Sequence, residues 1–309
     1  MTQANIALDS SGAISTLGRK QETMLSLTWR HFRKHRLALM GMAVLTVLVL
    51  GVILVPTLTN YDPGTTHILD KYEAPSLAHP MGTDGLGRDM LLRSMDGGRI
   101  SLMIAFLAML LAIGIGTLVG AIAGFYGGLA DNLLMRLADM MLTMPTLFVA
   151  ILLTQLLRAG VVPFLSAGIT PIILVIAATA WMPVARLVRA SFLSLKEKEF
   201  VEAARAGGAK NVRIMVRHIL PNATSPIIVA ATLSVGAAII TESGLSYLGF
   251  GVQPPIPTWG NMLQNAQAEM DYAPWTAIFP GILIFITVIS VNYIGDGLRD
   301  ALDPHHIAR

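Results

Sequence analysis

Six long apolar runs constrain this chain more than any other feature of its sequence. Each run approaches or exceeds the roughly 20 residues that a helix needs to cross a bilayer, whereas soluble core helices are usually shorter. Charged residues make up 13% of the chain, against about 25% in a typical soluble domain. The runs cover residues 37–56, 100–124, 133–157, 169–188, 226–250 and 275–295. We therefore predict an all-α integral membrane protein with six transmembrane helices.

The distribution of basic residues predicts the orientation of these helices, because cationic loops near spans are retained on the cytoplasmic side. With both termini inside, the internal segments hold most of the 22 Lys and Arg residues, including the sequence RHFRKHR at 30–36. The predicted parts are an N-terminal cytoplasmic tail (1–28), a first transmembrane helix with an external segment (29–98), and a core of five transmembrane helices (99–309) that contains a cytoplasmic loop (190–222). Within the external segment, residues 83–96 are expected to form an interfacial helix.

Glycine and proline mark where the predicted spans pack and bend. Gly116, Gly120 and Gly124 recur every four residues on one face of the second span, a spacing that lets helix backbones approach closely. Pro145, Pro183 and Pro280 fall inside or near the ends of three spans, where proline usually kinks a helix. A closely packed bundle with bent helices is expected.

Several classes of chemistry lack their sequence signatures. There is no GxxxxGK[ST] phosphate loop, no GxSxG or HExxH motif and no cysteine, so neither ATP binding by that loop, nor a catalytic site, nor a thiolate metal site is predicted. Nothing in the sequence predicts a nucleic-acid partner. The clear ionisable group deep inside an apolar run is Glu242, and ionisable residues at membrane depth are candidates for function.

The charged segment EFVEAARAGGAKNVRIMVRHILPN, residues 199–222, lies between two spans. Its first part predicts a helix ended by Gly207 and Gly208. Its second part predicts an amphipathic helix that Pro221 stops, with an apolar stripe at Val212, Met215, Val216 and Ile219 and a basic face at Lys210, Arg213 and Arg217. Glu202 and the small residues Ala203 and Ala204 indicate a docking surface. A surface helix resting on anionic lipid is the alternative interpretation of this pattern.

The same segment carries a resemblance to a known family. E-A-A followed by glycine six positions after the glutamate (Glu202 to Gly208), with Pro221 thirteen positions further on, resembles the EAA loop of inner-membrane permease subunits of ABC importers. The segments HPMGTDGLGRDMLLRSMDGGRISL, GFYGGLADNLLMRLADMMLTMP, ESGLSYLGFGVQPPIPTWGNML and GDGLRDALDP are similar to the C-type subunit of the dipeptide, oligopeptide and nickel permeases. The superfamily pattern ends I-x-L-P, and His218 takes the place of that isoleucine here.

The resemblance implies a type I ABC importer permease fold in a bacterial inner membrane. Its implied partners are a second homologous permease subunit, two cytoplasmic ATPase subunits that bind the ATP and Mg²⁺, and an external substrate-binding protein, so no cofactor is expected in this chain. The ATPase-coupling residues that it implies are Glu202, Ala203, Ala204, Gly207, Gly208, Arg213, Arg217 and Pro221. Glu242 is a candidate for translocation or gating. An ion-coupled secondary transporter and a structural membrane subunit remain alternatives, and the substrate is not specified.

Overall fold

The computed structural model describes residues 24–59, 65–160 and 163–302, so most of the predicted tail at 1–28 lies outside the described residues. No β-strand occurs in these ranges; one isolated bridge joins Thr83 and Asp89. The helices are α1 (Met24–Phe32), α2 (Arg36–Leu58), α3 (Met90–Tyr126), α4 (Gly128–Thr143), α5 (Thr146–Arg158), α6 (Thr170–Leu195), α7 (Glu199–Ala206), α8 (Asn211–Arg213), α9 (Thr224–Tyr247), α10 (Trp259–Ala266) and α11 (Trp275–Leu302). Short turns of 3₁₀-helix, η1 (Ile68–Asp70), η2 (Pro163–Leu165) and η4 (Leu220–Ala223), and a π-helix, η3 (Ile214–Ile219), complete the described elements.

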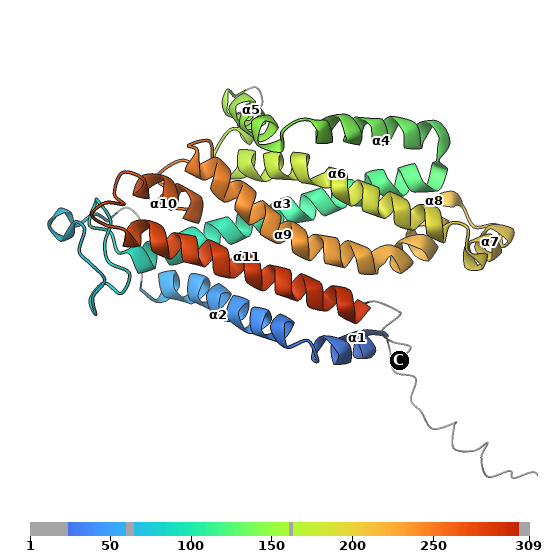
Figure 1. Ribbon diagram of the computed structural model, residues 1–309. Coiled ribbons are helices and arrows are strands. Elements are labelled where there is room, and N and C mark those ends of the chain that lie inside the picture. Colours follow the sequence, from blue (N-terminus) through green and yellow to red (C-terminus); the bar gives the residue numbers. More distant parts are fainter. Residues whose placement is uncertain (1–23, 60–64, 161–162, 303–309) are drawn as a thin grey trace, which may run out of the picture.

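The long helices form one elongated bundle, with α3 packed between α6 and α9 and with α11 lying along both α9 and α2 (Figure 1). Five helices of the described part are long and apolar enough to cross a membrane, and a bent pair makes a sixth candidate. α1, α7 and the end of α11 lie at one end of the bundle, and α10 lies at the other (Figure 1). This arrangement agrees with the predicted placement of the charged loop on the same side as the termini. Which side is cytoplasmic stays a prediction.

The third predicted span, 133–157, is wrong as a single helix. The chain forms α4 and α5 instead, with an angle of 97° between them. Met144 separates the two helices with extended dihedrals (φ −82°, ψ 139°), and Pro145 precedes α5. A residue before proline is driven out of the helical region by clash with the proline ring, and this accounts for the break at that point. α4 lies alongside α6, whereas α5 turns across one end of it (Figure 1).

The predicted glycine seam is confirmed, and its partner is α6. A Cβ atom added at Gly116, Gly120 or Gly124 would lie 2.4–2.7 Å from a backbone carbonyl oxygen of α6. No side chain fits into such gaps, so glycine at these three positions allows the backbones of α3 and α6 to touch.

The separate interfacial helix predicted for 83–96 is not formed. Residues 83–89 are a loop, and the residues after it are the first turns of α3. Asp89 caps α3, because its carboxylate accepts the Leu92 N–H at 2.9 Å. Asp84 instead closes the loop by accepting the Leu86 and Arg88 N–H groups.

Candidate functional site

The first half of the charged segment folds as predicted. α7 carries Glu202 in its first turn, where a carboxylate interacts favourably with the helix dipole. The helix ends at Gly207, and Gly208 takes the left-handed conformation with φ +77°. The Ala209 N–H donates to the Ala204 carbonyl at 3.1 Å, which completes a common helix ending that favours glycine at the left-handed position. Gly208, and not Gly207, meets this backbone requirement.

The second half differs from the prediction, because Pro221 does not stop the helix. The chain passes from α8 through η3 and η4 directly into α9, so residues 211–247 form one helical rod. In η3 the Leu220 N–H donates to the Met215 carbonyl, five residues back. This wider turn changes the hydrogen-bond register just before Pro221, which has no N–H to donate.

The predicted apolar stripe is confirmed at Met215 and Ile219, which pack in one buried cluster, and wrong at Val212 and Val216. Ile214 and Ile219 are fully buried, whereas Val212 and Val216 are 66% and 59% exposed. The stripe was placed with 3.6 residues per turn, and the π-helix has more residues per turn. Two apolar side chains are therefore left on the surface next to α7.

A buried cluster anchors this segment to the bundle. Val201 of α7 packs with Ile214 and Ile219, and the same cluster contains Val188 and Phe192 of α6. Ala121 of α3 and Ile227 of α9 also belong to it. A displacement of α7 therefore acts on α3, α6 and α9 together, since close-packed side chains transmit strain.

Apart from the exposed apolar side chains of Phe200, Val212 and Val216, the surface of this segment is polar or small. Exposed positions are Glu202, Ala203, Gly207, Gly208, Arg213, Arg217 and Pro221. Ala204 is half-buried and packs against the anchoring cluster. The predicted patch of Ala203 and Ala204 is thus divided, with Ala203 facing outward and Ala204 facing the bundle.

Glu242 lies near the opposite end of α9 and is completely buried. The Ser246 hydroxyl donates to its Oε1 at 2.7 Å, and the Ser101 hydroxyl of α3 donates to its Oε2 at 3.2 Å. Ser101 also accepts the Trp259 N–H, and Ser246 accepts the Val252 N–H. One carboxyl group therefore connects α3, α9 and the segment that leads into α10.

The short helix α10 is held tightly against this network. Trp259 is fully buried, and its ring N–H donates to the Ser94 carbonyl of α3 at 2.8 Å. Thr258 and Asn261 form a capping box at the start of α10, so that the first N–H groups of the helix are satisfied. Residues 252–262 thus close one end of the bundle over Glu242.

A groove of about 560 Å³ runs between α6 and α9, with Thr146 of α5 at its side. No charged residue lines it. Its hydroxyl groups belong to Thr146, Thr179, Ser234 and Thr241. The last three donate to carbonyls of their own helices at 2.7–3.2 Å, so they offer acceptor oxygens rather than free donors to the groove.

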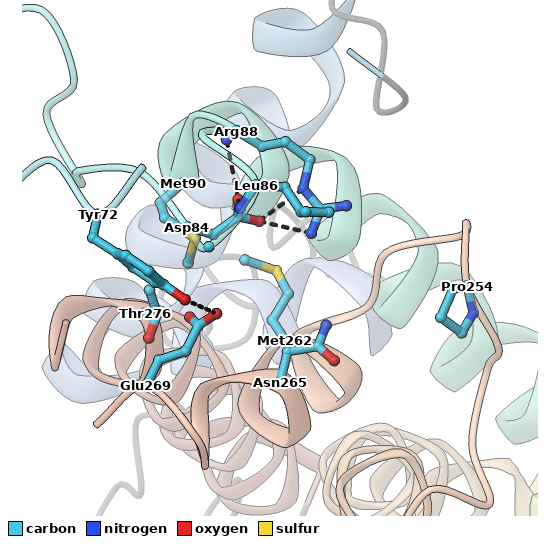
Figure 2. A pocket seen from close by; sticks show the side chains of 11 residues that line it. Tyr72, Asp84, Leu86, Arg88, Met90, Pro254, Met262, Asn265, Glu269 and Thr276 are labelled. Carbon is cyan, nitrogen blue, oxygen red and sulfur yellow. Dashed lines mark hydrogen bonds and ion pairs between the residues drawn. The ribbon is translucent and has the colours of Figure 1, made fainter. Parts of the chain in front are cut away.

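A second cavity of about 390 Å³ lies at the α10 end, where the loops at that end of the bundle meet (Figure 2). Arg88 is bound to Asp84 at 2.8 Å, and the Tyr72 hydroxyl donates to Glu269 at 3.4 Å. Burial, together with the nearby Asp84 charge, raises the pKa of the Glu269 carboxyl. A hydrogen bond with Tyr272 raises the pKa of the Tyr72 phenol. The loops before α3 and before α11 are thereby joined through polar side chains.

Two ion pairs between α4 and α6 were not foreseen. Arg189 binds both carboxylate oxygens of Asp131, and Arg186 binds Asp139. The partners are 58 and 47 residues apart in the sequence, so local spacing could not reveal them. The sequence does show aspartates in one helix and arginines in another. Pairing them, however, requires knowing that α4 lies beside α6.

Comparisons with known proteins agree with this architecture. Residues 116–307 match the family described as binding-protein-dependent transport system inner membrane component, and residues 23–75 match the N-terminal TM domain of oligopeptide transport permease C. The oligopeptide transport system permease protein OppC of Bacillus subtilis is 39% identical over 96% of this chain and 95% of its own length. The dipeptide transport system permease protein DppC of Alkalihalophilus pseudofirmus is 41% identical, covering 89% of this chain and 88% of that protein.

A third relative, the glutathione transport system permease protein GsiD of Pectobacterium atrosepticum, is 40% identical and covers 89% of each chain. Among solved structures, a chain of the inward-facing MetNI methionine ABC transporter superposes with a TM-score of 0.57 at 20% identity, covering 69% of this chain and 98% of that one. The likeness to that chain concerns the fold. The chain belongs to the family of binding-protein-dependent transport system inner membrane components, as a multi-pass permease subunit of an ABC importer with the type I fold.

Proposed function

We propose that this chain forms one half of the pathway by which an ATP-driven importer moves peptides or a related small solute. A second, homologous permease chain would form the other half. The groove between α6 and α9 supports this assignment, because a lining without charges neither traps nor excludes a peptide according to the charge of its side chains. The relatives are named as permeases for oligopeptides, dipeptides and glutathione, and these names support the substrate class.

The chain has a non-catalytic role in this proposal. Two separate cytoplasmic ATPase subunits bind the ATP and Mg²⁺, and an external binding protein delivers the solute. Membership of the family supports both kinds of partner. The permease contributes the pathway and the surface on which the ATPases act.

The coupling surface is the outer side of α7 with the following turn, residues 202–217. The observation that carries this assignment is the contrast within one short helix: Glu202 and Ala203 are exposed at the end of the bundle, while Val201 is buried in a cluster shared by three long helices. A partner that moves the outer side therefore moves α3, α6 and α9. Such coupling requires an element with two alternative arrangements, whose equilibrium is shifted both by the ATPase and by the solute. The broken pair α4–α5 is our candidate for that element.

The test is the yield of ATPase subunits that co-purify with the permease, together with substrate-stimulated ATP hydrolysis. Ala203→Trp should block close approach of the ATPase, and Glu202→Lys should weaken its attachment in a salt-dependent manner. Gly208→Val places a β-branched residue at φ +77°, which should distort the end of α7. Ala268→Trp, at an exposed position at the opposite end of the bundle, is the matched control and should leave the yield of co-purified ATPase unchanged.

The lipid-surface alternative predicts a different pattern. An added lysine at position 202 would then strengthen attachment to anionic membranes and leave co-purification intact. Wild-type yields for Glu202→Lys, Ala203→Trp and Gly208→Val would refute the coupling surface. Solute uptake by the chain alone in liposomes under an ion gradient would instead favour an ion-coupled carrier.

A further inference from the structure

A groove on the α2 side of the bundle differs from the one between α6 and α9. It has a volume of about 600 Å³ and runs between α2 and α3, with Val235 of α9 and Val291 of α11 at its floor. This volume is within the range of roughly 300–1,000 Å³ that is usual for pockets holding small organic ligands. Apart from one threonine and one arginine, its lining is apolar.

The groove has the length and depth of one lipid leaflet. On α2 its lining extends from Leu45 to Thr57, which corresponds to about 18 Å at 1.5 Å per residue. One leaflet of a bilayer contributes about 15 Å of hydrocarbon. Ile53 of α2, and Met103 and Phe106 of α3, are exposed along its rim, so its walls are open to the acyl chains of the membrane.

Arg99 stands at one end of this apolar groove and is exposed. Gly98, the residue before it, lies against Val52 of α2, so Arg99 is near the level of Val52, below Thr57. On α3, Arg99 directly precedes the apolar run at 100–124, so we expect the lipid headgroups near its guanidinium. Asp96, one turn earlier on α3, interacts electrostatically with Arg99 and with Arg93, but it does not line the groove.

We propose that this groove is a binding site for an anionic phospholipid. One acyl chain lies between α2 and α3, and the phosphate binds the Arg99 guanidinium. Charge complementarity selects the occupant: a cation at headgroup level above an apolar groove matches a lipid with an acidic headgroup and a long hydrocarbon chain. The bound lipid fills the space between α2 and the rest of the bundle at the α10 end.

Native mass spectrometry of the full-length chain tests this proposal, with phosphatidylglycerol and phosphatidylcholine of identical acyl chains as probes. We expect wild-type protein to retain phosphatidylglycerol in preference to phosphatidylcholine. Arg99→Gln should lower the affinity for phosphatidylglycerol about fivefold, as expected for one charge near an anionic surface. Arg99→Lys should preserve the preference. Arg36→Gln, which removes an exposed cation at the other end of α2, is the matched control.

Equal retention of both lipids by wild-type protein, or unchanged selectivity in Arg99→Gln, would overturn the proposal. A single cysteine at Met103 provides a second test, because the chain has no other cysteine. In the assembled transporter this cysteine should react with a membrane-soluble maleimide and should be protected by added phosphatidylglycerol. Efficient cross-linking from this position to the second permease chain would show that a protein subunit, and not lipid, covers the groove.

Discussion

The seam between α3 and α6 allows a sharp test of how closely this bundle is packed. We expect Gly120→Ala to destabilise the protein, because the new Cβ would lie 2.4 Å from the Ala185 carbonyl oxygen and 2.8 Å from the Val188 Cβ. Optimal separations between non-bonded heavy atoms are about 3.5–4.0 Å, so the two helices would have to separate by roughly 1 Å. The nearest neighbour is backbone, which cannot rotate away as the end of a side chain can.

The magnitude follows from two opposing effects. Overpacking costs about 1–3 kcal/mol, and the rigid backbone neighbour places Gly120→Ala near the upper end. Alanine in place of glycine favours the helix by about 1 kcal/mol, which leaves a net loss of about 2 kcal/mol. One kcal/mol shifts the Tm of a chain of about 150–250 residues by about 2–4 °C. With the same conversion, the expected fall in the Tm of this protein is about 4–8 °C.

Gly114→Ala is the matched control on the same helix. A Cβ at Gly114 has no neighbour within 4 Å, so we expect an unchanged Tm or a rise of up to about 2–4 °C from the gain in helix propensity. Thermal unfolding of both variants in the same detergent, followed by circular dichroism, provides the comparison. Equal shifts in the two variants, or a Gly120→Ala protein as stable as wild type, would refute close backbone contact along this seam.

Two other buried or partly buried groups lead to predictions. Glu242→Gln keeps one acceptor oxygen for the serines that donate to the carboxyl group, so we expect it to impair uptake more than membrane abundance. Glu242→Leu leaves both hydroxyls without that acceptor, which costs about 1–3 kcal/mol for each hydroxyl. We therefore expect Glu242→Leu to reduce membrane abundance as well as uptake. If Gln lowers abundance and uptake in equal proportion, Glu242 has a structural role only. For Glu269, whose pKa is raised on folding, the folded state binds the proton more tightly, so stability falls as pH rises from the unfolded to the folded pKa. Glu269→Gln should therefore match or exceed the wild-type Tm at pH 7, with the advantage disappearing below about pH 4, where both forms are neutral; a variant that is less stable at pH 7 than at pH 4, relative to wild type, would contradict this sign.

The sequence predicts the helices well where hydropathy alone determines them. The spans expected at 37–56, 169–188 and 275–295 correspond to α2, α6 and α11 with changes at their ends. The glycine spacing predicted a seam but could not name α6 as its partner, because the pairing of helices depends on the whole bundle. Hydropathy also could not distinguish one straight span from the bent pair α4–α5, since both have the same apolar content; Pro145 was the only local signal.

The candidate site was predictable in part for a related reason. Glu202 and Gly208 are where the motif places them, because a short helix with a glycine ending is determined locally. The π-helix is not determined locally: the burial of Ile214 and Ile219 against α6 accompanies a change of register that a period of 3.6 residues cannot describe. The partners of Glu242 are equally non-local, since Ser101 lies 141 residues away.

The ion pairs between α4 and α6 have a consequence for how the protein enters its membrane. α4 has 16 residues, or about 24 Å at 1.5 Å per residue, which is shorter than the roughly 30 Å hydrocarbon core. It also carries Asp131 and Asp139, whose arginine partners are in α6 and are synthesised later. A charged side chain at the centre of a bilayer costs about 2.5–3.5 kcal/mol on insertion scales. Asp131 is in the first turn of α4, so its own cost would be smaller than at the bilayer centre. We still expect α4 to insert poorly by itself and to become stable in the membrane once Arg186 and Arg189 have emerged, so that residues 128–195 would be integrated as one unit.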